Sequence, residues 1–232
     1  MKIGVEIVAY REERFIEECI KQFEGLDFRI LVMVSDTPWH GEKLPMDKTV
    51  EIAEKLGAEV VVGDWEKEHD QRNEGLKILK DCDWVLIVDA DKKYSKTSLK
   101  NLCKFLERAN YPAYGIGNLL TYWKTPNYVI EPPESGGLIV AVRPYVNFWD
   151  KRCIESDWDF LPDDVLMHHY SYVRTDEEMK KKISTFEHSD EIVDGWYEKV
   201  WKEWDNNKYL ENLHPVNPKS FERAIWTDGK II

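Results

Sequence analysis

The chain has 232 residues, 43% hydrophobic and 33% charged, a composition typical of one globular domain with a sizeable core. Its 32 basic and 44 acidic residues give a net charge of −12, which argues against nucleic acid as the main partner, because phosphate backbones require clustered Lys and Arg. No apolar run approaches the roughly 18 residues of a membrane span, and the start lacks a secretory pattern, so we expect a cytoplasmic protein without a transmembrane segment.

The cysteines give no sign of a disulfide framework or a zinc site. Cys19, Cys82, Cys103 and Cys153 are widely spaced, with no C-x-x-C pair and no Cys/His pair at zinc-site spacing. We therefore expect ordinary buried thiols in a reducing compartment.

Strands and helices alternate through the first hundred residues. Apolar runs predict strands at 2–10, 28–34, 59–62 and 84–88. Apolar stripes at helical spacing predict helices at 13–23, 47–56, 70–79 and 95–109. Ser95 is a suitable N-cap for the last helix. This alternation indicates βαβ units, and hence an α/β fold with a mostly parallel central sheet and helices on both faces.

The pattern changes after Asn110. Segments 113–123, 136–148 and 165–173 read as strands without helices between them, which indicates an antiparallel extension of the same sheet. Helical spacing returns at 175–188 and 190–205. We expect a single domain, residues 1–232, with parts at 1–110, 111–190 and a C-terminal helical extension at 191–232.

Every predicted parallel strand is followed by at least one carboxylate. The four strand ends carry Glu12 and Glu13, Asp36, Asp64, and the pair Asp89 and Asp91. In open α/β sheets, ligands bind beyond the carboxyl ends of the strands. So many carboxylates at one rim create a negative field, which a cation or a hydrogen-bonded ligand must compensate.

The sharpest of these strand ends is "DWVLIVDADKKY". Residues i and i+2 of an extended segment project to the same side, so Asp89 and Asp91 could share one divalent cation. Mg²⁺ and Mn²⁺ suit carboxylate and phosphate oxygens. The alternative is that the pair only closes the turn after the strand. Lys92 and Lys93 are expected to face solvent.

The helix before that strand carries an arginine on its apolar side. In "QRNEGLKIL", Arg72, Leu76 and Leu79 stand at i, i+4 and i+7, so Arg72 begins the buried face. Its guanidinium can lean toward the rim and meet a phosphate or a base edge. The alternative is an arginine that snorkels to water.

"AYREE", "SD" and "RNEGLKILKDCDWVLIVDAD" together resemble a nucleotide-sugar-dependent glycosyltransferase of the GT-A fold, closest to the family 2 type, over roughly residues 1–190. The resemblance implies a nucleotide-binding half at 1–110 and, at 111–190, a half that binds the acceptor and completes a metal site. It implies a nucleoside-diphosphate sugar as donor, with a UDP-sugar preferred, and a hydroxyl acceptor.

The resemblance also implies residue roles. Tyr10, Glu13, Asp36 and Arg72 would line the nucleotide pocket, Asp89 would contact the ribose or the metal, and Asp91 would bind the Mn²⁺ or Mg²⁺ that bridges the diphosphate. The chain departs from the family at Arg11, where Asn usually precedes the Glu. It also lacks the Gln-x-x-Arg-Trp box of processive synthases, so we expect single transfers.

A second group of polar residues occurs in "PDDVLMHHYSYVR", residues 162–174. The segment from His169 to Tyr172 is similar to a His-x-Ser-Tyr segment of some soluble relatives, where the histidine completes the metal site. A neutral imidazole can bind Mn²⁺. Strand alternation sends His168 and His169 to opposite faces, and we favour His169 as the ligand. The alternative is a histidine hydrogen-bonded within the sheet.

Transfer with inversion needs a carboxylate that removes the acceptor's proton. Asp163, Asp164 and Glu134 are the candidate bases, with Asp164 preferred, although each is also a plausible turn or surface acid. A retaining enzyme needs no base at that position. The metal would stabilise the leaving diphosphate as a Lewis acid, and Lys or Arg residues between 174 and 182 could add charge.

Aromatic residues gather near the C-terminus. Tyr197, Trp201 and Trp204 stand at i, i+4 and i+7, which indicates a helix docked on the body by its aromatic face, or else a stacking surface for an acceptor. The lysines at 180–182 read as a solvated helix face.

Other functions share parts of these patterns. A haloacid-dehalogenase-type phosphatase expects Thr or Val where Lys93 stands. A sugar-nucleotide-forming nucleotidyltransferase needs a Gly-rich basic loop after the first strand, which "AYREERF" lacks. A non-catalytic nucleotide-sugar-binding protein is the third alternative.

Overall fold

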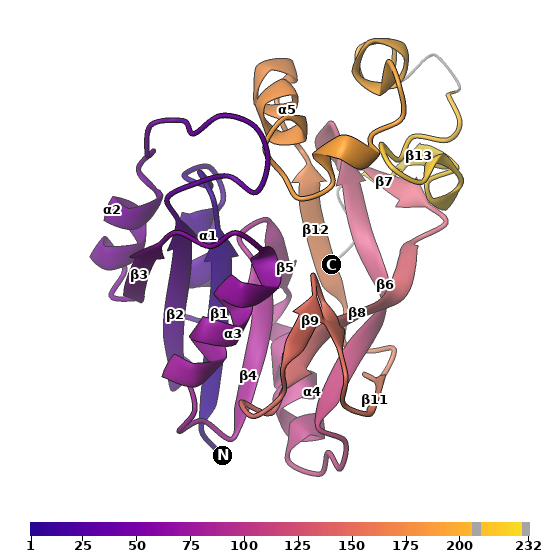
Figure 1. Ribbon diagram of the computed structural model, residues 1–232. Coiled ribbons are helices and arrows are strands. Elements are labelled where there is room, and N and C mark those ends of the chain that lie inside the picture. The colour runs from indigo at the N-terminus through magenta and orange to yellow at the C-terminus, as the bar shows by residue number, and fades with distance from the viewer. Residues whose placement is uncertain (206–209, 229–232) are drawn as a thin grey trace.

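The computed structural model describes residues 1–205 and 210–228. The four predicted parallel strands are confirmed, and they lie in the order β3-β2-β1-β4 (Figure 1). They are β1 (Ile3–Ala9), β2 (Phe28–Ser35), β3 (Glu59–Gly63) and β4 (Trp84–Asp89). The central strands β1 and β4 are apolar runs because helices cover both of their faces.

The helices of the first half divide between the two faces of the sheet. They are α1 (Ile16–Lys21), α2 (Thr49–Lys55), α3 (Glu68–Ile78) and α4 (Lys96–Leu106). Apolar residues of α1, α2 and α4 pack in one core, and Leu76 of α3 packs in the other. Ser95 caps α4 as predicted, because its hydroxyl accepts a hydrogen bond from the Ser98 N–H at 3.0 Å.

The second half extends the sheet as the sequence predicts, but its pairing is mixed rather than antiparallel throughout, and it contains strands that the sequence alone did not reveal. The short strand β5 (Lys92–Tyr94) follows β4 within the first half. The strands that extend the sheet are β6 (Ala113–Trp123), β7 (Thr125–Glu131), β8 (Glu134–Val142), β11 (Trp158–Phe160) and β12 (Met167–Tyr172). β9 (Phe148–Asp150) and β10 (Cys153–Ile154) form a separate two-stranded sheet. β8 lies antiparallel between β4 and β6. β12 pairs with β6 in parallel and with β5 antiparallel. The missed β7 begins with three exposed residues and so lacks an apolar signal.

The C-terminal part is less helical than predicted. α5 (Asp176–Ile183) begins with a capping box between Thr175 and Glu178. The expected helix at 190–205 is instead a 3₁₀ turn (Ser189–Glu191) and a short π-helix (Tyr197–Trp201), separated by Gly195 in the left-handed region. After a 3₁₀ turn (Pro218–Ser220), β13 (Arg223–Trp226) pairs with β7, so the part at 191–232 also contributes a strand. Residues 206–209 and 229–232 of that part lie outside the described residues.

The aromatic residues of this part form a core of their own. Trp196 and Trp201 are buried and pack against Trp123 of β6. The docking interpretation of the aromatic face is therefore confirmed. The cysteines are all free, but only Cys19 and Cys82 are buried and Cys153 is exposed, which corrects the expectation of four buried thiols.

Candidate active site

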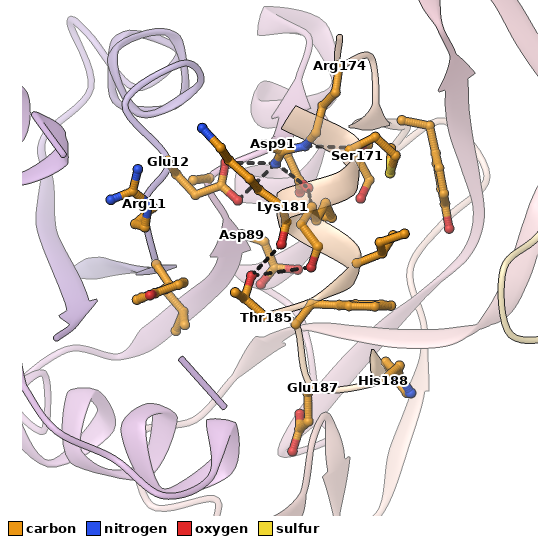
Figure 2. Close-up of a pocket in the computed structure, with 18 of the residues that line it drawn as sticks. Arg11, Glu12, Asp89, Asp91, Ser171, Arg174, Lys181, Thr185, Glu187 and His188 are labelled. Carbon is orange, nitrogen blue, oxygen red and sulfur yellow. Dashed lines mark hydrogen bonds and ion pairs between the residues drawn. The ribbon is translucent and has the colours of Figure 1, made fainter. Parts of the chain in front are cut away.

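A cavity of about 500 Å³ lies beyond the carboxyl ends of β1 and β4. Its walls come from the loop after β1, the end of β4, β8, β12 and α5 with the residues that follow it. Figure 2 shows Glu12, Asp91 and Arg174 on one side, with Glu187 and His188 further along the wall. Of the predicted site residues, those that line the cavity are Tyr10, Glu13, Asp89, Asp91, Glu134 and His169.

Asp91 is a buried carboxylate, 5% exposed. The Tyr170 N–H donates to its backbone carbonyl at 2.8 Å, which fixes the turn after β4 against β12. Lys182 Nζ donates to Oδ2 at 3.2 Å, whereas Oδ1 is buried without a hydrogen-bond partner. Burial alone would raise the pKa of Asp91, but Lys182, Lys92 and His169 outweigh it and hold that pKa below its ordinary range. Asp91 is therefore an ionised group with one free acceptor atom.

Asp89 lies beside Asp91 but is saturated with cations. Its carboxylate accepts hydrogen bonds from Arg72 Nη2 at 3.0 Å, from Arg152 and from Lys92. Burial opposes ionisation, but Arg152, Lys92 and Arg72 lower the pKa of Asp89 well below its ordinary value. The charge of Asp89 is thus already compensated by side chains of the protein.

Arg72 is fully buried, as its place on the apolar face of α3 predicts, so the snorkelling alternative is wrong. It pairs with Glu68 as well as Asp89, and it is not among the residues that line the cavity. Arg152, which does line the cavity, escaped sequence analysis because the β9–β10 hairpin has no periodic pattern.

Two lysines that were expected to face solvent instead contact the carboxylates of the site. Lys92 was expected to face solvent but is only 5% exposed, because its ammonium group lies between Asp89 and Asp91. Lys182, expected on a solvated helix face, points instead at Asp91. Both side chains take these positions because the two carboxylates would otherwise be buried without compensation.

Each residue of the Arg-Asn-x-Gly motif has a structural partner. The Asn73 side chain donates to the Phe148 carbonyl at 2.7 Å and accepts from the Phe148 N–H at 2.8 Å, which anchors the hairpin that carries Arg152. Gly75 makes room for the buried Glu6 of β1, since a Cβ at Gly75 would lie 2.3 Å from Glu6 Oε1. The motif therefore joins α3 to β1 and to the β9–β10 hairpin.

His169 faces the cavity and His168 does not, as strand alternation predicts. His169 Nδ1 lies 3.0 Å from Glu134 Oε2 and 3.2 Å from Thr121 Oγ1, and Nε2 lies 3.8 Å from Asp91 Oδ1. On the opposite face, His168 Nδ1 lies 2.8 Å from the Tyr122 hydroxyl. Burial opposes ionisation of Glu134, but His169 and Thr121 lower its pKa to about 2.

The remaining predicted residues lie outside the cavity or at its edge. Asp36 pairs with Lys43, and Asp164 accepts a hydrogen bond from Asn101 of α4 at 3.0 Å. Neither these acids nor Asp163 lines the cavity. At its edge, Tyr10 Oη accepts from the Leu44 N–H at 3.3 Å.

Arg11, which stands where the family usually has Asn, has an unusual backbone conformation. Arg11 has a φ of +53°, in the left-handed region that Asn tolerates better than residues with larger side chains. The asparagine that the family usually has at this position suits this conformation. The loop after β1 keeps its shape here at a cost in backbone strain.

Within the described residues, no group of three or more His, Cys, Asp or Glu side chains is arranged to hold a metal ion. Mg²⁺, however, is usually bound through one or two carboxylates, with substrate phosphates and waters completing its shell. Asp91 Oδ1 and His169 Nε2, 3.8 Å apart, fit that pattern, because two ligands each about 2.1 Å from one ion can be up to about 4 Å apart. The unpartnered oxygen of Asp91 is the atom that favours a cation here.

Comparisons with known proteins show the family to which this chain belongs. Residues 5–146, more than half of the chain, match the model of the family described as Glycosyl transferase family 2. A curated relative, an uncharacterized glycosyltransferase of Rickettsia bellii (strain RML369-C), is 36% identical over 95 residues, which are 41% of this chain and 29% of that protein. The chain therefore spans less than a third of that relative.

Solved structures of S. aureus TarS are also similar. The complex of residues 1–349 with UDP-GlcNAc has 23% identity over 52% of this chain and 35% of that chain, with a TM-score of 0.39. Another TarS structure has 17% identity over 79% of this chain and 40% of that chain, with a TM-score of 0.48. No helix among residues 1–205 and 210–228 is long and apolar enough to cross a membrane. The family match shows that this chain belongs to glycosyl transferase family 2, and the α/β sheet described above agrees with the fold expected from the sequence.

Proposed function

We propose that this enzyme transfers one sugar at a time from a nucleoside-diphosphate sugar to a hydroxyl acceptor, with Mn²⁺ or Mg²⁺, and that a UDP-sugar is the first donor to test. The observation that carries the proposal is the buried Asp91, whose unpartnered Oδ1 faces His169 Nε2 inside the cavity. A buried acceptor without a partner is costly unless a ligand completes it.

The cavity has the size and the lining for such a donor. Its volume of about 500 Å³ lies within the range of small-molecule sites. Tyr10, Trp39 and Leu44 supply apolar and aromatic lining suited to a nucleobase, and Lys151, Lys181 and Lys182 add positive charge to the same cavity. We propose that the base lies against the aromatic and apolar lining and that the diphosphate lies next to Asp91 and these lysines.

Asp91 and His169 would hold the divalent cation, with Asp89 next to them. When bound, the ion would act as a Lewis acid on the diphosphate oxygens. The chain's own contribution is to keep Asp91 ionised, to aim its free oxygen into the cavity, and to set lysine and arginine side chains around the leaving group. Because Arg72, Arg152 and Lys92 already compensate the charge of Asp89, we propose that Asp89 contacts the ribose and does not bind the metal.

We assign the proton acceptor to Glu187 rather than to the acids expected from the sequence. Glu187 lines the cavity, and its Oε2 is buried without a hydrogen-bond partner. Burial and the neighbouring Glu68 raise the pKa of Glu187 to about 8, near the pH at which an efficient base works. Glu187→Gln should lower kcat and flatten its pH profile.

The decisive test is a thermal-shift screen of UDP-, GDP-, TDP- and CMP-sugars, each with and without Mn²⁺. We expect a metal-dependent shift for one nucleoside diphosphate, lost in Asp91→Ala and kept in Glu54→Gln, which removes an exposed carboxylate of α2. Donor hydrolysis without acceptor would separate a transferase from a binding protein. No shift with any nucleotide would overturn the proposal.

A further inference from the structure

We propose that Glu134 is the positioning residue of His169: it keeps the ring proton on Nδ1, so that Nε2 presents a free electron pair toward Asp91. The inference rests on the proposed function, because it concerns the cation site of that proposal. It gives Glu134 a role other than the base expected from the sequence.

The hydrogen bonds around His169 Nδ1 allow only one assignment. The Thr121 hydroxyl donates its single proton to Glu134 Oε2 at 2.7 Å, so toward the ring Thr121 Oγ1 can only accept. Glu134 Oε2, which receives that proton, can also only accept from the ring. Since both neighbours of Nδ1, at 3.0 and 3.2 Å, are acceptors, Nδ1 must carry the proton.

The other ring nitrogen is left without a hydrogen bond among the described residues. Nε2 lies 3.8 Å from Asp91 Oδ1, beyond hydrogen-bonding distance. Asp91 Oδ1 accepts no hydrogen bond either, and the Lys92 ammonium lies 3.9 Å from it. In the neutral ring with its proton on Nδ1, Nε2 is an electron-pair donor. Two electron-pair donor atoms that make no hydrogen bond thus face each other, which is the arrangement that a shared cation requires.

Three strands fix this arrangement. His169 of β12 stands opposite Thr121 of β6 in the parallel pairing, and Glu134 begins β8, the neighbour of β6 on its other side. The His169 side chain is 10% exposed and that of Glu134 26% exposed, so the ring has little freedom to turn. Metal-binding histidines commonly donate their second N–H to a carboxylate, and loss of that partner typically costs about 10- to 100-fold in metal affinity.

The first test needs no substitution in Glu134. Long-range ¹H–¹⁵N spectra of histidine-labelled, metal-free protein, recorded at a pH at which the ring is neutral, report which nitrogen carries the proton. His169→Asn identifies the signal. We expect the proton on Nδ1. A neutral ring with its proton on Nε2 would overturn the inference, whether or not the protein binds a nucleotide.

The second test measures Mn²⁺ affinity by electron paramagnetic resonance in the presence of UDP. Glu134→Gln should weaken Mn²⁺ binding by about 10- to 100-fold, while Glu54→Gln should leave it unchanged. Equal affinity in wild type and Glu134→Gln would overturn the inference. If wild type binds no Mn²⁺ with any nucleotide, the proposed function fails, and the spectra still decide the role of Glu134. If Glu134→Gln does not fold, as judged by circular dichroism, the wild-type spectra decide alone.

Discussion

Arg174 Nη2 donates to both carboxylate oxygens of Glu12, at 2.9 and 2.8 Å. The contact joins Arg174, two residues before α5 begins, to the loop after β1, and both side chains are largely buried. Arg14 adds a second link to the same helix through Glu178, at 2.5 Å. The wall of the cavity formed by α5 is thus held by ion pairs to the first strand's loop.

Removal of Arg174 should destabilise the protein strongly. Loss of one partner of a buried ion pair leaves an uncompensated charge and typically costs about 3–5 kcal/mol. We expect Arg174→Met to lower the free energy of unfolding by about 3 kcal/mol in urea titrations, and Arg174→Met with Glu12→Leu to recover part of it. A loss below about 0.5 kcal/mol, the value of an exposed pair, would contradict this prediction.

Gly75→Ala should destabilise the protein although alanine favours helices. The gain in helix propensity is about 1 kcal/mol, but the added Cβ would lie 2.3 Å from Glu6 Oε1 and 2.5 Å from Cδ. Overpacking of this kind costs about 1–3 kcal/mol. Glu6→Ala removes the clashing atoms, so the double variant should be more stable than the two separate losses predict. Additive losses in chemical denaturation would show that the two residues do not interact.

Because Glu6 is buried, the free energy of unfolding should fall as the pH rises. Burial outweighs the attraction of Arg72 and Arg152 and raises the pKa of Glu6 from 4.5 to about 8. Between these values the unfolded chain releases a proton that the folded protein keeps, so the folded state loses up to about 1.4 kcal/mol per pH unit. The stability advantage of Glu6→Gln over wild type should therefore grow from pH 5 to pH 8 and then level off. A difference that is constant with pH would contradict burial of the neutral acid.

Arg11→Asn should stabilise the fold. A residue other than Gly in the left-handed region costs of order 1 kcal/mol, and Asn adopts it more readily. We expect a gain of about 0.5–1 kcal/mol in urea titrations. Arg11→Lys keeps both the charge and the strain, so it should leave stability unchanged, and an equal gain in that variant would refute the backbone explanation.

Lys182→Gln should have opposite effects on two ligands. The ammonium group, 3.2 Å from Asp91 Oδ2, competes with an added cation for that carboxylate. Its removal should strengthen binding of Mn²⁺ alone by about tenfold and weaken binding of UDP without metal. Calorimetry measures both affinities. Lys180→Gln, on the exposed side of α5, is the matched control. Weaker Mn²⁺ binding in Lys182→Gln would exclude the competition.

The sequence predicted the parts of this molecule that depend on local pattern. The apolar runs predicted β1 to β4, helical spacing placed Arg72 on the buried face, and strand alternation sent His168 and His169 to opposite faces of the sheet. The choice of His169 for the cavity came from the family resemblance. These predictions hold because periodicity reports directly which side of an element is buried.

Contacts between distant segments could not be predicted in this way. Lys92 reads as a turn residue until the carboxylates around it are known to be buried, and Lys182 reads as a surface lysine until α5 is placed over Asp91. Asp164 was expected near the site, but it lies beside α4, in the turn that precedes β12, whereas His169 lies within that strand. The direction of β12, unknown from the sequence, decides how far Asp164 lies from the site.

Because β5 pairs with β12, the site can form only late in the synthesis of the chain. Lys92 stands opposite His169 in that ladder, and the cations that neutralise Asp89 and Asp91 include Arg152 and Lys182 from the second half of the chain. During synthesis, the first hundred residues emerge with two acids that still await these partners. A fragment ending near Asn110 should therefore not bind nucleotide as an autonomous unit, and activity should appear only after α5 has left the ribosome.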